Sequence, residues 1–122
     1  MTHNNLSLFL VEDEALISMD LEALVEDLGH VVIGLSARVA QAISLLEMLE
    51  VLPDAAIVDA NLGGESARPV VEAFAARGIP TIIASGYKSD ELEKMGIRGA
   101  TITKPYNARA INEALEKLFA KN

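Results

Sequence analysis

Four short apolar runs in this chain each end in a polar residue that could take part in phosphoryl transfer. The runs Leu6–Val11, Ala55–Val58, Thr81–Ala84 and Gly99–Thr103 are followed by, or end at, Glu12–Asp13, Asp59, Ser85 and Lys104, in that order. If the runs are neighbouring parallel strands, their carboxyl ends share one edge of a sheet, where ligands of such sheets bind. Three carboxylates, a hydroxyl and an ammonium would then line one cleft, able to bind a divalent cation and to accept phosphate on Asp59.

The carboxylates have both a metal-binding and a purely structural interpretation. Mg²⁺ keeps several waters and uses one or two protein carboxylates, so Glu12 and Asp13 beside Asp59 suit this ion. Taken alone, Asp13 or Glu14 could simply cap the first helix at its positive end. Asp59 alone could form a turn ahead of Gly63–Gly64. The coincidence of these acids with Lys104 at matching strand ends favours the metal site.

Asp59 and the two residues on the other side of the cleft complete the expected chemistry. A bound cation would keep Asp59 ionised, as a nucleophile must be. The Ser85 hydroxyl can donate to a phosphoryl oxygen, and Lys104 can pair with Asp59 before transfer and with the phosphoryl group afterwards. Taken singly, Ser85-Gly86 is an ordinary turn and Lys104 a solvated lysine. Pro105 restricts the backbone of the lysine before it.

The elements that must position these residues alternate regularly along the chain. Besides the four runs, Val31–Leu35 is predicted as a strand. Helices are predicted over Glu14–Leu28, Val39–Leu52, Glu65–Arg77, Glu91–Met95 and Asn107–Ala120. This alternation predicts an α/β, flavodoxin-like (βα)₅ fold with a parallel sheet of order 2-1-3-4-5 and helices on both faces. The first strand–helix turn has no glycine-rich fingerprint, which argues against a Rossmann arrangement.

Particular residues mark the ends and the apolar faces of the predicted helices. Apolar residues of the first helix recur at spacings of three or four: Leu16, Met19, Ala23 and Leu24. Gly29 is placed to end that helix, and Pro53 to close the second. Pro69 falls near the first turn of the third helix, where proline is tolerated, and Asn107 caps the last.

Composition restricts the class of protein. The 122 residues include 18 acids and 10 bases, for a net charge of −8. Because the basic residues are scattered rather than clustered, we expect no nucleic-acid partner. No apolar stretch approaches the roughly 20 residues of a membrane span, and the N-terminus lacks the features of a signal peptide. We therefore expect a cytoplasmic protein with one domain over residues 1–122, a core from about 6 to 119 and no output domain.

On these residues the chain resembles a receiver domain of bacterial two-component response regulators, of the single-domain type, over essentially all its length. The resemblance implies that Asp59 is the phosphoacceptor and that Asp13 binds Mg²⁺ directly. It further implies that Glu12 acts on the metal through water and that the backbone carbonyl of Asn61 is another ligand. The phosphoryl donor would be a histidine kinase or a histidine phosphotransfer protein.

The resemblance also assigns the other side of the cleft, with two departures. Ser85 would be the switch hydroxyl and Lys104 the phosphate-binding lysine, with the peptide before Pro105 cis. Many receivers carry a switch aromatic in the fifth strand, where this chain has Thr101, so no rotating-aromatic relay is expected at that position. The segment Ile83–Tyr87 instead resembles a subgroup of stand-alone receivers whose fourth strand ends Phe-Ala-Thr-Gly-Gly-Tyr or similar. Its closing tyrosine is a candidate for the signalling role, with a plain surface tyrosine as the alternative.

As a receiver, the chain would catalyse only its own phosphorylation and a slow autodephosphorylation. It would signal through protein–protein interaction with a kinase, a phosphotransfer protein or an effector, or act as a phosphate sink. The candidate surfaces are Lys88–Lys94, the fifth strand and the last helix, and the chain would be a monomer or a weak homodimer.

Two other classes of function compete with this one. The first is a pseudo-receiver that keeps the fold as a protein-binding module and is never phosphorylated. The second is a Mg²⁺-dependent phosphatase with an aspartyl nucleophile. Enzymes of the haloacid-dehalogenase type need a second acid two residues after the nucleophile, where this chain has Asn61. The chain also lacks the length for a cap domain, so the phosphatase is disfavoured.

Overall fold

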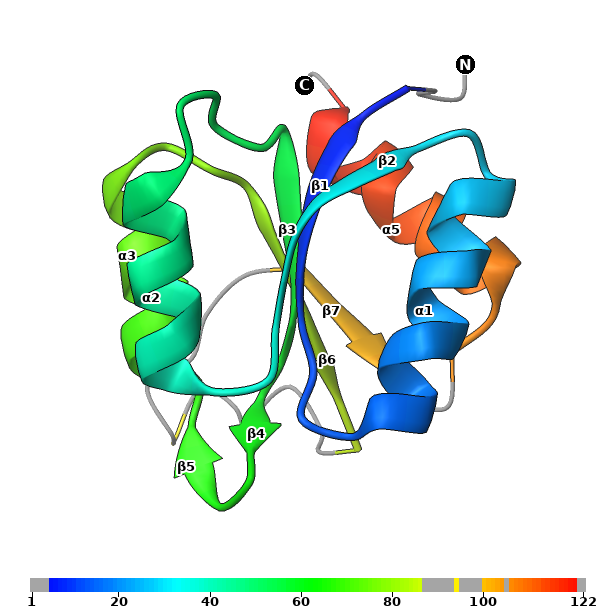
Figure 1. Cartoon of the computed structure of the whole chain (residues 1–122). Helices are drawn as coiled ribbons and strands as arrows, with labels where there is room; N and C mark the ends of the chain where they lie inside the picture. Colours follow the sequence, from blue (N-terminus) through cyan, green and yellow to red (C-terminus); the bar gives the residue numbers. More distant parts are fainter. Residues whose placement is uncertain (1–4, 87–93, 95–99, 105, 121–122) are drawn as a thin grey trace.

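The computed structural model describes residues 5–86, 94, 100–104 and 106–120. A five-stranded parallel sheet with the order β2-β1-β3-β6-β7 forms the centre of the fold (Figure 1). Its strands are β1 (Ser7–Val11), β2 (Val31–Ser36), β3 (Ala55–Asp59), β6 (Thr81–Ser85) and β7 (Ala100–Thr103). A separate antiparallel hairpin consists of β4 (Asn61–Leu62) and β5 (Glu65–Ser66). Without the hairpin strands the order reads 2-1-3-4-5, which confirms the predicted flavodoxin-like fold.

Helices cover both faces of this sheet (Figure 1). They are α1 (Ala15–Asp27), α2 (Val39–Met48), α3 (Arg68–Ala76) and α5 (Ala108–Phe119). The α1–α5 pair covers one face and the α2–α3 pair the other. Because successive strand residues point to opposite faces, Phe9 packs under α2 and α3 while Leu8 and Leu10 pack under α1 and α5. Every residue of β3 is buried, as expected for a central strand covered on both faces.

Several helix boundaries follow the predicted signals. Gly29 follows α1 with φ +96°, a left-handed conformation that suits glycine at a helix end. The Asn107 side chain caps α5 by accepting a hydrogen bond from the Ala110 N–H at 2.9 Å. Pro69 lies in the first turn of α3.

Other boundaries and one helix face differ from the predictions. The second helix ends at Met48 instead of Leu52, because Leu49 already has an extended backbone (φ −72°, ψ 128°). The third helix begins at Arg68 rather than Glu65, because Glu65 and Ser66 pair with Asn61 and Leu62 in the hairpin. In α1 the buried residues are Ser18, Leu21 and Val25, whereas Leu16 and Met19 are 78% and 65% exposed. Two apolar stripes share the same helical spacing in α1, so spacing alone did not select the buried one.

Some predictions fall outside the described residues. These are the charged helix expected over Glu91–Met95, of which only Lys94 is described, the conformation of Tyr87 and the peptide before Pro105. Within the described part of the chain, no helix has both the length and the apolar character to cross a membrane.

A close approach between β1 and β2 generates a stability prediction. The strand pairing shifts between Leu8 and Phe9, which places Gly34 opposite Phe9. A Cβ at Gly34 would lie 2.5 Å from Phe9 Cδ2. The Phe9 ring is fully buried and packs edge-on against Phe74 with centroids 5.1 Å apart, so it has little room to shift.

We predict that Gly34→Ala lowers the free energy of unfolding by about 1–3 kcal/mol, as overpacked cores do. Urea denaturation measures the change. Gly86→Ala is the matched control, because a Cβ there would meet no atom of the described residues within 4 Å, and it should change stability by less than about 0.5 kcal/mol. Equal stabilities for the two variants would contradict this account of the β1–β2 contact.

Candidate functional site

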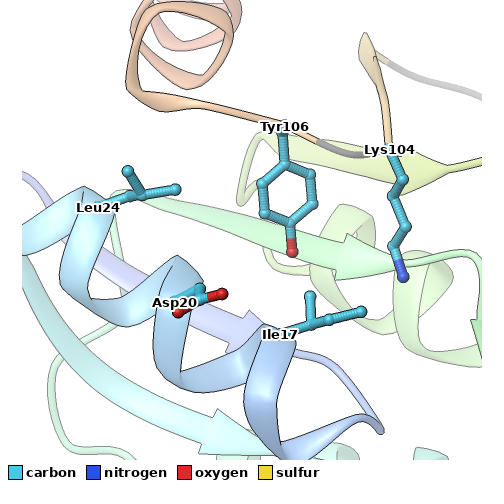
Figure 2. Close-up of a pocket in the computed structure, with 5 residues that line it drawn as sticks. All are labelled: Ile17, Asp20, Leu24, Lys104 and Tyr106. Carbon is cyan, nitrogen blue, oxygen red and sulfur yellow. The ribbon is translucent and has the colours of Figure 1, made fainter.

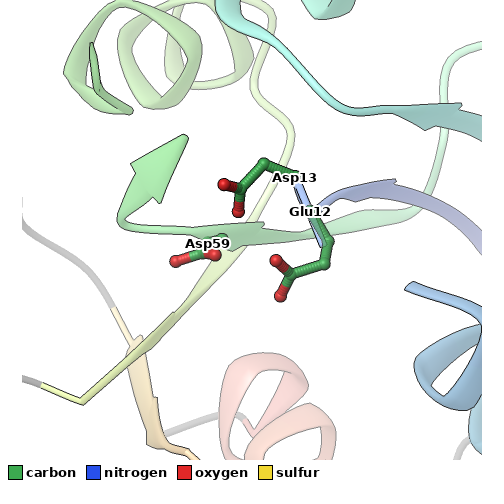
Figure 3. A group of neighbouring side chains, drawn as sticks. All are labelled: Glu12, Asp13 and Asp59. Carbon is green, nitrogen blue, oxygen red and sulfur yellow. The ribbon is translucent and has the colours of Figure 1, made fainter. Parts of the chain in front are cut away.

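The carboxyl ends of β1, β3, β6 and β7 meet at one edge of the sheet and bring the predicted polar residues together. Pairing aligns Val11 with Val58, and Ser85 with Thr103, so the residues that follow these strands are neighbours. The side chains of Glu12, Asp13 and Asp59 gather at this edge (Figure 3). One carboxylate oxygen from each of the three lies within 4.8 Å of the others, so the group could hold a metal ion.

Lys104 supplies the countercharge to two of these acids. Its Nζ donates a hydrogen bond to Asp59 Oδ2 at 2.8 Å and lies 3.0 Å from Glu12 Oε1. The other Asp59 oxygen, Oδ1, accepts from the Asn61 N–H at 3.1 Å. Both oxygens of Asp59 are therefore engaged, although the side chain remains at the surface of the polar cleft described below.

Glu12 is held differently from Asp59. Its Oε2 accepts a hydrogen bond from the Glu14 N–H at 3.2 Å. Its Oε1 makes the close ion pair with Lys104 but has no hydrogen bond of good geometry, and it is buried. A buried carboxylate oxygen with spare accepting capacity is a position that an added cation or its water could satisfy.

Asp13 connects the first strand to the hairpin. Its Oδ2 accepts a hydrogen bond from the Gly63 N–H at 2.9 Å. The Asn61 side chain in turn accepts from the Gly64 N–H at 2.8 Å. Gly63 and Gly64 have φ of +62° and +92°, the left-handed region that glycine occupies without strain. Sequence reasoning treated this Gly-Gly pair as a turn and missed that its N–H groups position Asp13 and Asn61.

Burial and proximity shift the ionisation of the cluster. Burial raises the pKa of Glu12 to about 7, and its contact with Asp59 acts in the same direction. Burial alone would lower the pKa of Lys104, but its contacts with Asp59 and Glu12 outweigh burial and raise it. Burial alone would raise the pKa of Asp13, but hydrogen bonds with Glu12, Asp59 and the Gly63 N–H lower it. The pKa values of Glu12 and Asp13 are thus shifted in opposite directions, so Asp13 loses its proton at a lower pH than Glu12.

A polar cleft of about 460 Å³ opens over the cluster. Asp13, Asp59, Asn61, Ser85 and Lys104 line it. Ser85 is buried at the end of β6, and its carbonyl accepts the Lys104 N–H at 2.9 Å, which holds the two strand ends together. The structure therefore gathers every site residue that the sequence pointed to around this cleft, with Glu12 at the base of the cluster.

A second hollow lies on the α1 side of Lys104 (Figure 2). Ile17, Asp20 and Leu24 of α1 line it together with Lys104 and Tyr106, and its volume is about 350 Å³. The Tyr106 ring extends towards α1, and its hydroxyl is buried with no hydrogen-bond partner. Burial, followed by the charge of Glu12, raises the pKa of this hydroxyl. Sequence reasoning did not select Tyr106, although its place two residues after Lys104 was a signal.

Known proteins are similar to this chain in both sequence and fold. No protein-family model matches it. It is 33% identical over 84 residues to the phyllosphere-induced regulator PhyR of Methylorubrum extorquens. That match covers 66% of this chain and 30% of the relative, so the chain spans less than a third of that protein.

Several solved structures match over almost the whole chain. The REC (receiver) domain of the Erythrobacter litoralis response regulator PhyR superposes with a TM-score of 0.81 at 26% identity, covering 98% of this chain and 95% of that domain. SdrG from Sphingomonas melonis superposes with a TM-score of 0.78 at 37% identity, covering 98% of this chain and all of SdrG. With the strand order and the acidic cluster, these similarities show that the chain belongs to the receiver-domain family of response regulators.

Proposed function

We propose that this receiver accepts a phosphoryl group on Asp59 from a histidine kinase or a histidine phosphotransfer protein. The observation that carries the proposal is the Asp59 carboxylate, bound by Lys104 Nζ at 2.8 Å and grouped with two further acids beside an open polar cleft. An Asp59 oxygen attacks the phosphorus of the donor phosphohistidine. The P–N bond breaks, and the imidazole nitrogen keeps the bonding electrons and is protonated. The product is an aspartyl phosphate.

Lys104 and Ser85 would stabilise the product. Lys104 Nζ already lies against an oxygen of Asp59, and a phosphoryl group on that carboxylate would offer it further anionic oxygens. Ser85 follows the neighbouring strand and lines the same cleft, so its hydroxyl would donate to another phosphoryl oxygen. A change in these two contacts, on β6 and after β7, is how phosphorylation would alter the surface that a partner protein recognises.

Mg²⁺ is the cofactor that the donor set fits. Asp13, Asp59 and the backbone carbonyl of Asn61 would hold it, with Glu12 acting through water. The cluster offers only oxygen ligands, and the buried Glu12 Oε1 has unused accepting capacity. When bound, the ion would neutralise charge on the oxygens of the phosphoryl group.

The acceptor role of Asp59 is tested with a small phosphodonor. We predict that the chain incubated with acetyl phosphate and Mg²⁺ gains the mass of a single phosphoryl group, measured on the intact protein. Asp59→Asn should gain none, because the amide is not a nucleophile. Asp27→Asn, at the end of α1, is the control for the loss of one acid and should react like the parent. No mass gain in the parent would instead favour the pseudo-receiver, and steady hydrolysis of a phosphoester would favour the phosphatase.

Metal binding is tested by measuring the thermal stability of the protein, independently of phosphorylation. A ligand that binds only the folded state at ten times its dissociation constant stabilises that state by about 1.4 kcal/mol. We predict that Mg²⁺ raises the melting temperature of the parent by several degrees and has little effect on Asp13→Asn. NaCl at matched ionic strength is the control for screening. A shift of the same size in Asp13→Asn would exclude Asp13 as a ligand.

The raised pKa of Glu12 predicts how stability depends on pH in metal-free protein. The unfolded chain loses the Glu12 proton near pH 4.5, whereas the folded protein keeps it to about pH 7. Between these values the unfolded state binds fewer protons, so the contribution of Glu12 to stability falls as pH rises from about 4.5 to about 7. Relative to Glu12→Gln, the parent should therefore lose about 1–3 kcal/mol across this window.

Urea denaturation in EDTA at several pH values between 4.5 and 7.5 measures this relative loss. Glu26→Gln, an exposed change on α1, is the control and should follow the parent. A difference between parent and Glu12→Gln that stays constant with pH would show that Glu12 keeps an ordinary pKa in the fold.

A further inference from the structure

Arg38 lies at the outer margin of the acidic cluster, a position that sequence reasoning did not single out. It is an exposed residue that follows β2 and precedes α2, with an extended backbone (φ −137°). Its Nη1 lies 3.3 Å from the point that a Cβ of Gly63 would occupy, and Asp13 Oδ2 lies 3.9 Å from the same point. The guanidinium and the Asp13 carboxylate are therefore neighbours around Gly63.

The Gly63 position allows this approach. Its N–H donates to Asp13 Oδ2 at 2.9 Å, so the hairpin turn already touches the carboxylate. Any side chain at this position would crowd the Arg38 guanidinium, which now packs where that side chain would begin. The hairpin glycine thus lies against both Arg38, which follows β2, and Asp13, which follows β1.

Arg38 differs from the cations that form ion pairs in the described part of the chain. Lys104 lies between two acids, and Arg68 and Arg109 each pair with a glutamate one helical turn away. No ion pair or hydrogen bond is recorded for the Arg38 side chain among the described residues, although Asp13 lies on the same side of Gly63. Within the described residues, no acid therefore pairs with this charge.

We propose that Arg38 tunes this site through its charge. It lowers the affinity of the acidic cluster for a divalent cation and speeds the reaction of an anionic phosphodonor with Asp59. The proposal rests on the proposed phosphoacceptor function and adds a residue that sets the balance between cation binding and donor approach. Arg38 is a positioning residue, since it touches the hairpin glycine next to Asp13 and not the reacting oxygens. Because Arg38 is exposed, salt screens its effect.

Three variants separate charge from structure. Arg38→Gln removes the charge, Arg38→Lys keeps it, and Arg77→Gln removes a charge from the end of α3, just before β6 begins and so at the opposite edge of the sheet. Two quantities are measured at low salt. The first is the Mg²⁺ dissociation constant of each protein, by NMR titration. The second is the rate of mass gain from acetyl phosphate with Mg²⁺ saturating for that protein.

The two measurements should move in opposite directions. Arg38→Gln should bind Mg²⁺ about three-fold more tightly and gain phosphate about three-fold more slowly, as expected when one exposed, partly screened charge is lost. Both differences should shrink in 0.5 M NaCl. Arg38→Lys and Arg77→Gln should behave like the parent.

Other outcomes overturn the proposal in distinct ways. If either quantity in Arg38→Gln equals that of the parent, or if Arg38→Lys behaves like Arg38→Gln, the charge of Arg38 does not tune the site. Differences that persist unchanged in 0.5 M NaCl would assign Arg38 a structural role instead. A parent that gains no phosphate contradicts the proposed function itself, whereas a parent that gains phosphate and matches Arg38→Gln contradicts only the role of Arg38.

Discussion

The mutual repulsion of three carboxylates at one sheet edge is the interaction on which the rest of this site depends. Glu12, Asp13 and Asp59 follow or end two adjacent strands, and their oxygens lie within 4.8 Å of one another. Like charges at this separation inside a partly buried site are costly unless they are protonated or compensated. Lys104 compensates two of them, while burial, together with the contact with Asp59, raises the pKa of Glu12. A site with this excess of negative charge is suited to bind a cation.

The small hairpin after β3 gives the site its second support. It places the N–H of Gly63 on Asp13 and the N–H of Gly64 on the Asn61 side chain. The N–H of Asn61 in turn holds Asp59. One short turn therefore orients residues from both β1 and β3. The same turn brings the Arg38 guanidinium beside Asp13, so the electrostatics of the site extend to the connection between β2 and α2.

The two faces of the sheet have different relations to the site. The α1–α5 face contains the hollow beside Lys104, where the buried Tyr106 hydroxyl has no hydrogen-bond partner. Leu16 and Met19 of α1 are also exposed. The other face is closed by α2 and α3 over Phe9 and Phe74. The open space beside Lys104 therefore lies on the α1–α5 side.

The sequence by itself determined the fold and the composition of the site. Alternating apolar runs and amphipathic stretches predict a parallel sheet, and parallel strands place their carboxyl ends at one edge, where Asp13, Asp59, Ser85 and Lys104 were therefore expected. The strand order, which makes these residues neighbours, is less firmly determined by the sequence. Local signals at Gly29 and Asn107 also determined helix ends, because caps act within a few residues.

Only the tertiary structure decided the features that depend on residues distant along the chain. Leu16 and Leu21 belong to equally spaced apolar stripes of α1, and packing against the sheet selected the stripe with Leu21. Glu65–Ser66 pairs with Asn61–Leu62, so α3 begins at Arg68 and not at Glu65. Gly63 contacts Asp13, and the Arg38 guanidinium lies beside the same glycine. These contacts bring together the segments that follow β1, β2 and β3. No local pattern encodes them, because their geometry exists only once β1, β2 and β3 lie side by side.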